Sequence, residues 1–177
     1  MLKLYQYQAG HDLDAFHACD DQQANRDQVV AAIMNYNTWN FASLVVEKRK
    51  VNPSIRDEHH FYPKFASMVL RFVFKGRVRR GTSRVLIYTD TLPMSKRRTA
   101  VEATIKASCR ADLGGTSFHS FHHNRQSNTW IQVADYCAWG TFRKWESGDV
   151  RTYDQLRPRL AAAELDIMAR GDGTIYY

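Results

Sequence analysis

The sequence predicts an α/β fold in which a mixed or parallel sheet is flanked by helices. Two short β-rich runs, RVLIYTD at 84–90 and SFHSFHH at 117–123, are separated by a segment with the three- and four-residue apolar spacing of a helix. Strands that alternate with helices in this way are typical of layered α/β folds. The 177 residues suit one domain over 1–177, and 44% hydrophobic residues are ordinary for a globular protein.

The first half of the chain contains one expected strand between two expected helices. Apolar residues at helical intervals predict a helix through QQANRDQVVAAIMNY, at 22–36, with Asp20 or Asp21 at its N-cap. Aromatic and β-branched residues in WNFASLVVEKRK predict a strand over 39–50. A second helix is expected over 58–74, where phenylalanines recur at helical spacing.

The second half continues the alternation. The run at 84–90 is almost continuously apolar up to its acidic end, which predicts a central strand covered on both faces. The helix that follows it is expected to end at the glycine pair Gly114 and Gly115, ahead of the strand at 117–123. A last helix is expected over 156–169.

A single aspartate stands among large apolar side chains in TWIQVADYCAWGTFRKW, at 129–145, which also reads as a helix. On a wheel of about 100° per residue, Asp135 falls toward the apolar side, next to Trp139, while Gln132 and Tyr136 take the more polar side. An ionised carboxylate that faces a core is costly unless it is paired, hydrogen-bonded or bound to a metal. The fold is therefore expected to supply a partner for this charge.

The bulk composition limits the class of partner and the compartment. A net charge of +7 and a pI near 9.5 favour an acidic partner such as nucleic acid, although a soluble protein that is merely basic stays open. Cys19, Cys109 and Cys137 have no disulfide or zinc-knuckle spacing, which indicates reduced thiols and a cytoplasmic location. No apolar run is long enough for a membrane span, and the N-terminus does not resemble a signal peptide.

Two carboxylates are candidates for a shared metal. Asp90 closes the strand at 84–90, and ligand-binding residues collect at the carboxyl ends of central strands in open α/β sheets. Asp135 lies on the helix that follows the next strand, so the two could meet across the sheet. Oxygen ligands without a cysteine pattern favour Mg²⁺ or Mn²⁺, which can activate water for phosphate hydrolysis. Alternatively, Asp90 simply begins a turn, and Asp135 forms an ion pair with a basic side chain.

Basic residues flank the strand that ends at Asp90, and two histidines close the next expected strand. His122 or His123 fits a proton carrier or a phosphate contact, with ordinary polar histidines on a strand rim as the alternative. Two basic runs bracket the strand that ends at Asp90, and such residues could hold a phosphate backbone. The nucleic-acid-binding candidates in these runs are Arg77, Arg79, Arg80, Lys96, Arg97 and Arg98.

The run SNTWIQVADYCAWGTFRKWESGDVRTYDQL, at 127–156, resembles the C-terminal signature of domain-of-unknown-function family 3800. That signature has a serine, a leucine- or isoleucine-glutamine pair, the trio Ala-Asp-Tyr and a helix that ends near Gly-Asp. The resemblance continues upstream through His122 and His123, YTD ending at Asp90, VVEK ending at Lys48, and FHA at 16–18.

Members of that family resemble ribonuclease H-like domains and are regarded as metal-dependent nucleases. The resemblance therefore implies a ribonuclease H-like mixed sheet and a nuclease dependent on Mg²⁺ or Mn²⁺. By motif, Asp90 and Asp135 would be the metal ligands, and Lys48 would be a supporting group.

The chain departs from the family pattern at its N-terminus. Family members open with a strand that bears Asp followed by Ser-Gly and supplies the first metal ligand, and no such strand occurs here. The fold is then truncated relative to the family, and a homodimer or another second chain would complete the sheet unless MLKLYQYQ does so. Glu47 and Glu58 are candidate substitute ligands, with a salt bridge and a helix start as their alternatives. The alternative function is a non-catalytic nucleic-acid- or protein-binding module that retains the fold.

Overall fold

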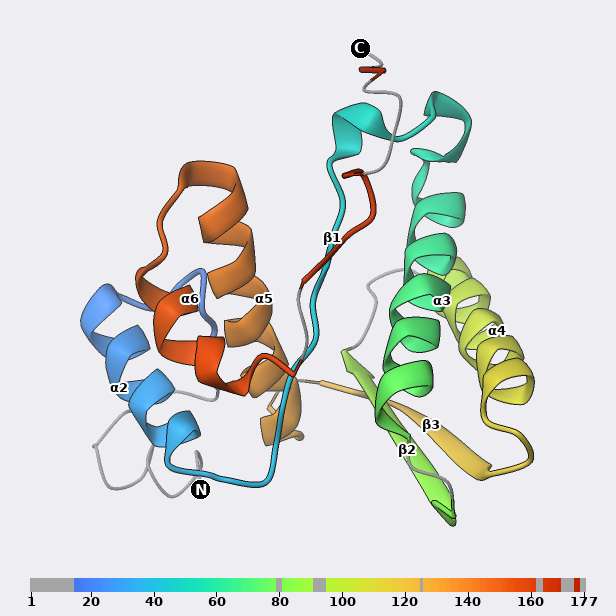
Figure 1. Ribbon diagram of the computed structural model, residues 1–177, viewed down its shortest axis with the longest axis horizontal. Coiled ribbons are helices and arrows are strands. Elements are labelled where there is room, and N and C mark those ends of the chain that lie inside the picture. Colours follow the sequence, from blue (N-terminus) through green and yellow to red (C-terminus); the bar gives the residue numbers. More distant parts are fainter. Residues whose placement is uncertain are drawn as a thin grey trace. The chain divides into compact units, whose positions relative to one another are not determined.

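The computed structural model describes residues 15–78, 81–90, 95–124, 126–161, 164–169 and 174–175, with the backbone alone at 76–77 and 95–97. Its elements are shown in Figure 1. The described residues form a mixed α/β structure with five helices and small parallel sheets, which confirms the predicted class. They divide into two compact units: unit 1 is Met1–Ser43 with Asn124–Glu164, and unit 2 is Leu44–His123 with Leu165–Tyr177. Membership of both units in one domain stays a prediction.

Unit 1 is built from three helices, α2 (Gln23–Met34), α5 (Thr129–Ser147) and α6 (Arg151–Leu156). Helix α5 begins where the Asn128 side chain accepts a hydrogen bond from the backbone N–H of Trp130, and it ends at Gly148, which has φ of 70°. Asn128 is therefore the N-cap. The buried core of unit 1 consists of Phe16, Ala18, Val29, Val30, Ile33, Trp39, Val133, Tyr136, Cys137 and Leu156.

The predicted aspartate cap of α2 is wrong. Gln22 is the N-cap residue, and its side chain makes no capping hydrogen bond. The carboxylate of Asp21 instead accepts hydrogen bonds from the Tyr136 hydroxyl and from the backbone N–H of His17. A contact with a distant helix thus takes the place of the local cap.

The buried face of α5 differs from the one that its apolar pattern predicts. Gln132 and Tyr136 are 1% and 0% exposed, whereas Phe142 is 52% exposed. The two buried side chains are accommodated because each makes a hydrogen bond: Gln132 Oε1 accepts from the backbone N–H of Phe16 at 3.2 Å, and Tyr136 donates to Asp21. The polar side of this helix therefore packs inward.

Two further elements differ from their predicted bounds. The expected strand over 39–50 is reduced to β1 (Leu44–Val45), because its parallel partner β4 (Leu165–Asp166) is only two residues long. The expected helix over 156–169 is wrong, since α6 ends at Leu156 and a short 3₁₀ turn follows. Pro158 contributes to the stop, because proline lacks the backbone N–H that would continue the helical hydrogen bonds.

Unit 2 contains a two-stranded parallel ribbon, β2 (Arg84–Asp90) and β3 (Ser117–His123), whose bounds match the prediction. Helices α3 (Glu58–Arg77) and α4 (Ser95–Asp112) run side by side next to it (Figure 1). The buried core of unit 2 consists of Phe74, Val101, Ile105, Cys109 and Leu113.

The β2–β3 ribbon is covered on one face within unit 2. Val85, Ile87 and Phe118 pack against the core of the unit, while Leu86 and Tyr88 on the opposite face are 49% and 42% exposed. The prediction of a strand covered on both faces is therefore wrong for the described residues of this unit. No helix among the described residues is long and apolar enough to cross a membrane.

Replacing Ile105 by alanine should destabilise unit 2. Its side chain is 2% exposed in the core, and such truncations cost about 2–5 kcal/mol. Urea unfolding followed by circular dichroism measures the change. Lys106→Ala is the matched control on the same helix, because it is exposed and should shift stability by no more than about 0.5 kcal/mol. Equal effects of the two substitutions would contradict the proposed core.

Candidate functional site

The carboxylate of Asp135 is held by the loop that precedes α2. Its Oδ2 atom lies 2.8 Å from His17 Nδ1 and accepts a hydrogen bond from the backbone N–H of Ala18 at 2.9 Å. The side chain is 31% exposed, so the charge is half-buried. Because a carboxylate only accepts hydrogen bonds, His17 Nδ1 carries a proton, and Nε2 is the ring nitrogen that points away from Asp135.

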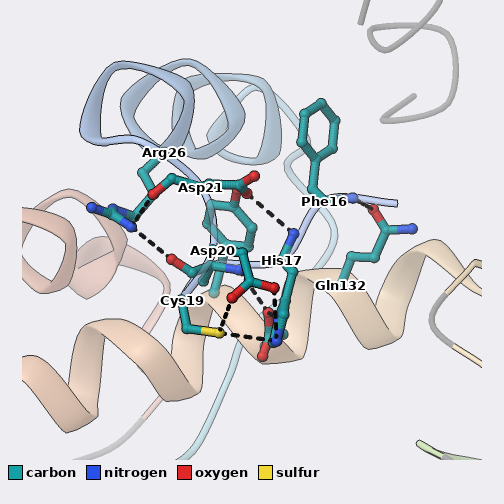
Figure 2. Close-up of polar contacts among 10 residues, drawn as sticks. Phe16, His17, Cys19, Asp20, Asp21, Arg26 and Gln132 are labelled. Carbon is teal, nitrogen blue, oxygen red and sulfur yellow. Dashed lines mark hydrogen bonds and ion pairs between the residues drawn. The ribbon is translucent and has the colours of Figure 1, made fainter. Parts of the chain in front are cut away.

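The Nε2 side of the His17 ring faces the thiol of Cys19 and the carboxylate of Asp20 (Figure 2). His17 Nε2 lies 3.0 Å from Cys19 Sγ and 3.8 Å from Asp20 Oδ2, and Cys19 Sγ lies 3.1 Å from Asp20 Oδ1. We call His17, Cys19 and Asp20 the HCD cluster. Each residue has one side-chain nitrogen, sulfur or oxygen atom that could bind a metal ion, and these three atoms lie within 4.8 Å of one another. The hydrogen bond to Asp20, burial, and the charges of Asp20 and Asp135 raise the pKa of the Cys19 thiol.

The backbone of this loop is fixed by contacts on several sides. The carbonyl oxygen of His17 accepts from the backbone N–H groups of Asp20 and Asp21, each at 3.0 Å. The Arg26 guanidinium donates to the carbonyl oxygens of Ala18, at 2.8 Å, and of Asp21. Burial, followed by the hydrogen bond to Asp21, raises the pKa of Tyr136, so its hydroxyl remains a donor to this loop. The HCD cluster therefore sits on an ordered turn.

A polar pocket of about 240 Å³ opens beside Cys19 in unit 1. The guanidinium carbons of Arg26 and Arg143 lie 5.5 and 5.6 Å from the ring centre of Trp139, as in cation–π contacts. Arg151 forms a bidentate pair with Asp149, at 2.9 and 2.7 Å, and this pair holds the pKa of Asp149 far below its usual range. The lining residues are Cys19, Asp21, Gln23, Arg26, Trp139, Arg143, Asp149, Arg151 and Thr152.

This arginine pocket was not predicted from the sequence. Its three guanidinium groups come from two helices and the start of a third, and two carboxylates accompany them, so one positive formal charge remains. A planar guanidinium recognises phosphate or carboxylate through paired hydrogen bonds. The pocket is thus suited to an anionic group.

In unit 2, the parallel register brings together three of the predicted site residues. Asp90 pairs with His123, and Thr89 pairs with His122, at the carboxyl end of the ribbon. Thr89 Oγ1 lies 2.6 Å from His122 Nδ1, and His122 Nε2 lies 3.9 Å from Glu102 Oε2. Asp90 belongs to unit 2 and Asp135 to unit 1, so their shared metal site stays a prediction.

The other predicted residues have local partners or lie outside the description. The Glu47 carboxylate forms ion pairs with Lys50 at 2.9 Å and Arg49 at 2.7 Å, the alternative that the sequence left open, and both pairs lower its pKa. The Lys48 ammonium lies 5.6 Å from the ring centre of Phe61. Of the basic candidates, Arg98 is exposed on α4, Arg77, Lys96 and Arg97 are described by their backbone alone in α3 and α4, and Arg79 and Arg80 lie outside the described residues, as does MLKLYQYQ.

The donor atoms of the HCD cluster do not fit Mg²⁺ or Mn²⁺. These ions take carboxylate, carbonyl and water oxygens, whereas the cluster offers an imidazole, a thiol and one carboxylate. The nearby Asp135 Oδ2 already accepts two hydrogen bonds. An Mg²⁺ or Mn²⁺ site in this chain would therefore need carboxylates from outside the cluster.

Alkylation of the native protein should modify Cys19 alone. Cys19 is exposed, whereas Cys109 and Cys137 are buried, and burial raises the pKa of Cys137 to about 12, so its reactive thiolate is scarce. Iodoacetamide near neutral pH, in the presence of EDTA, should add one adduct, located by peptide mass spectrometry. Cys19→Ser should abolish it. An adduct on Cys137 before Cys19 would contradict this burial.

Neither a protein-family model, nor a curated protein, nor a solved structure matches this chain. The distances, burial and charges of the site therefore carry its functional interpretation.

Proposed function

We propose that the chain is a metal-dependent phosphodiester hydrolase that acts on nucleic acid. The observation that carries the proposal is the arginine pocket beside Cys19, in the same unit as Asp135. Three arginines in one pocket of about 240 Å³ suit a phosphate group with part of its sugar, since pockets for drug-sized ligands are larger. A phosphate of a longer polymer could enter while the rest of the strand stays outside.

The whole-chain charge and the sequence resemblance support the same class of substrate. The net charge of +7 favours association with a polyanion. The residues at 127–156 resemble the signature of family 3800, and within this proposal the mixed α/β structure is a ribonuclease H-like fold. Asp90 and His123, in register at one end of the β2–β3 ribbon, fit the strand-end position of a catalytic carboxylate.

The residues of the chain would have separate roles in the reaction. Arg143 and Arg26, held against Trp139, would bind the phosphate and stabilise the charge that develops on it. Asp135, in the unit of the arginine pocket, and Asp90, at the end of β2, are each proposed to bind Mg²⁺ or Mn²⁺, which would supply activated water. A histidine, His122 or His123, would carry a proton, because imidazole titrates near neutral pH.

A second candidate function is a nucleic-acid-binding module without catalysis. It is favoured by the two hydrogen bonds that already occupy Asp135 Oδ2. The arginine pocket would then bind phosphate groups without cleaving them.

Substitution of Asp135 should separate the two functions. Labelled single- and double-stranded DNA and RNA are incubated with the protein and Mg²⁺, Mn²⁺, Zn²⁺ or EDTA, and products are resolved on denaturing gels. We expect metal-dependent cleavage that falls at least about 100-fold in Asp135→Asn, a loss typical of a removed electrostatic group. Glu146→Gln, an exposed change on the same helix, should cleave normally. Binding without any cleavage would favour the module instead.

Arg143→Gln should weaken nucleic-acid binding whether or not the protein cleaves. Loss of one phosphate contact reduces the slope of log affinity against log salt concentration by about one. Fluorescence anisotropy with a labelled oligonucleotide over a range of salt concentrations measures this slope. Arg110→Gln, exposed on α4, is the matched control. An unchanged slope in Arg143→Gln would show that the pocket does not hold phosphate.

A further inference from the structure

The HCD cluster has the donor set and spacing of a transition-metal site. Zn²⁺ binds histidine nitrogen, cysteine sulfur and carboxylate oxygen at about 2.0–2.3 Å, which places ligands of a tetrahedron about 3.3–3.8 Å apart. The observed separations are 3.0 Å from His17 Nε2 to Cys19 Sγ, 3.1 Å from Cys19 Sγ to Asp20 Oδ1, and 3.8 Å from His17 Nε2 to Asp20 Oδ2. Small rotations of two exposed side chains would bring the shorter distances into this range.

Asp135 supplies a second, independent feature of such sites. Histidines that bind metals usually donate their other ring N–H to a carboxylate, which fixes the tautomer and makes the ligand nitrogen more basic. His17 Nδ1 meets Asp135 Oδ2 at 2.8 Å, and Nε2 is directed toward Cys19 and Asp20. The same oxygen accepts from the backbone N–H of Ala18, which orients the carboxylate in turn.

The charges around the thiol also favour a cation over a free nucleophile. Asp20 Oδ1 lies 3.1 Å from Cys19 Sγ, and Asp135 Oδ2 lies 2.8 Å from Nδ1 of the neighbouring His17 ring. Two carboxylates oppose an uncompensated thiolate, but they stabilise a thiolate that is bound to a divalent ion. The simple catalytic triad of cysteine, histidine and aspartate is therefore the weaker interpretation of these contacts.

We propose that His17 Nε2, Cys19 Sγ and the Asp20 carboxylate bind Zn²⁺, with Asp135 as the positioning residue for His17. Three protein ligands leave a fourth position for water, which is the arrangement of catalytic rather than structural zinc sites. The arginine pocket shares Cys19 with this site, so an anionic ligand in the pocket would lie beside the metal. A role of the metal in hydrolysis rests on the proposed function, whereas the binding of Zn²⁺ does not.

Metal titration of the full chain tests the site directly. Protein freed of metal with a chelator is titrated with Zn²⁺ against a competing chromophoric chelator, and with Co²⁺ as a spectroscopic probe. We expect one ion per chain and a sulfur-to-cobalt charge-transfer band. His17→Gln and Asp20→Asn should weaken binding, and Cys19→Ser should also abolish the band. Cys109→Ser, a buried thiol in unit 2, should retain both.

The Zn²⁺ affinity of Asp135 variants tests whether this residue positions His17. Asp135→Ala should weaken Zn²⁺ affinity by about 10–100-fold, the usual effect of losing such a partner. Asp135→Asn should recover part of this loss, because its amide oxygen can still accept from His17 Nδ1. At saturation, both variants should show the charge-transfer band, since the three ligands remain; circular dichroism checks that each is folded.

Two results would overturn the zinc site: no charge-transfer band in the wild type, or the same Zn²⁺ affinity in Cys19→Ser. Nucleic-acid cleavage with Mg²⁺ but no zinc binding would reject this inference and leave the proposed function in place. Zinc binding with the expected variant pattern, but without cleavage, would support the inference and reject the hydrolase.

Discussion

The contact on which unit 1 depends is the one between the Asp135 carboxylate and the loop at His17 and Ala18. A half-buried carboxylate must be compensated, and here an imidazole and a backbone amide do so at 2.8 and 2.9 Å. These bonds join residues 118 and 117 positions apart in the chain. The same contact that compensates the charge also orients the His17 ring, so stability and chemistry share one interaction.

The neighbouring residues of α5 explain why this loop can approach the helix so closely. Gln132 and Tyr136 lie one turn apart around Asp135, and their polar atoms meet the backbone of Phe16 and the carboxylate of Asp21. Buried polar groups that are fully hydrogen-bonded specify a single arrangement, because any other leaves a donor or acceptor without a partner. Three side chains on one helix thus hold one loop in a single register.

Some arginines of unit 1 are neutralised by a neighbouring carboxylate, but the arginine pocket keeps an excess of positive charge. Asp149 is paired with Arg151 and lies 3.6 Å from Arg143, while Arg26 is tied to two backbone carbonyls. Trp139 makes cation–π contacts with both Arg26 and Arg143, which keeps guanidinium groups at the pocket without requiring further carboxylates. Preorganised positive charge next to a mixed-donor cluster is a suitable setting for an anionic ligand, and it is the physical basis of both proposals.

Short-range patterns in the sequence were sufficient for β2, β3 and the start of α3, because β-branched and aromatic runs, helical apolar spacing and an acidic first turn act locally. They were not sufficient for the strand expected over 39–50, whose length depends on a partner strand from the far end of the chain. The composition determined the basic charge, and the apolar context of Asp135 determined that its carboxylate required a partner. Only the tertiary structure decided that this partner is His17, that the polar side of α5 is buried, and that arginines from separate helices share one pocket, because each of these contacts joins groups whose sequence separation carries no periodic signal.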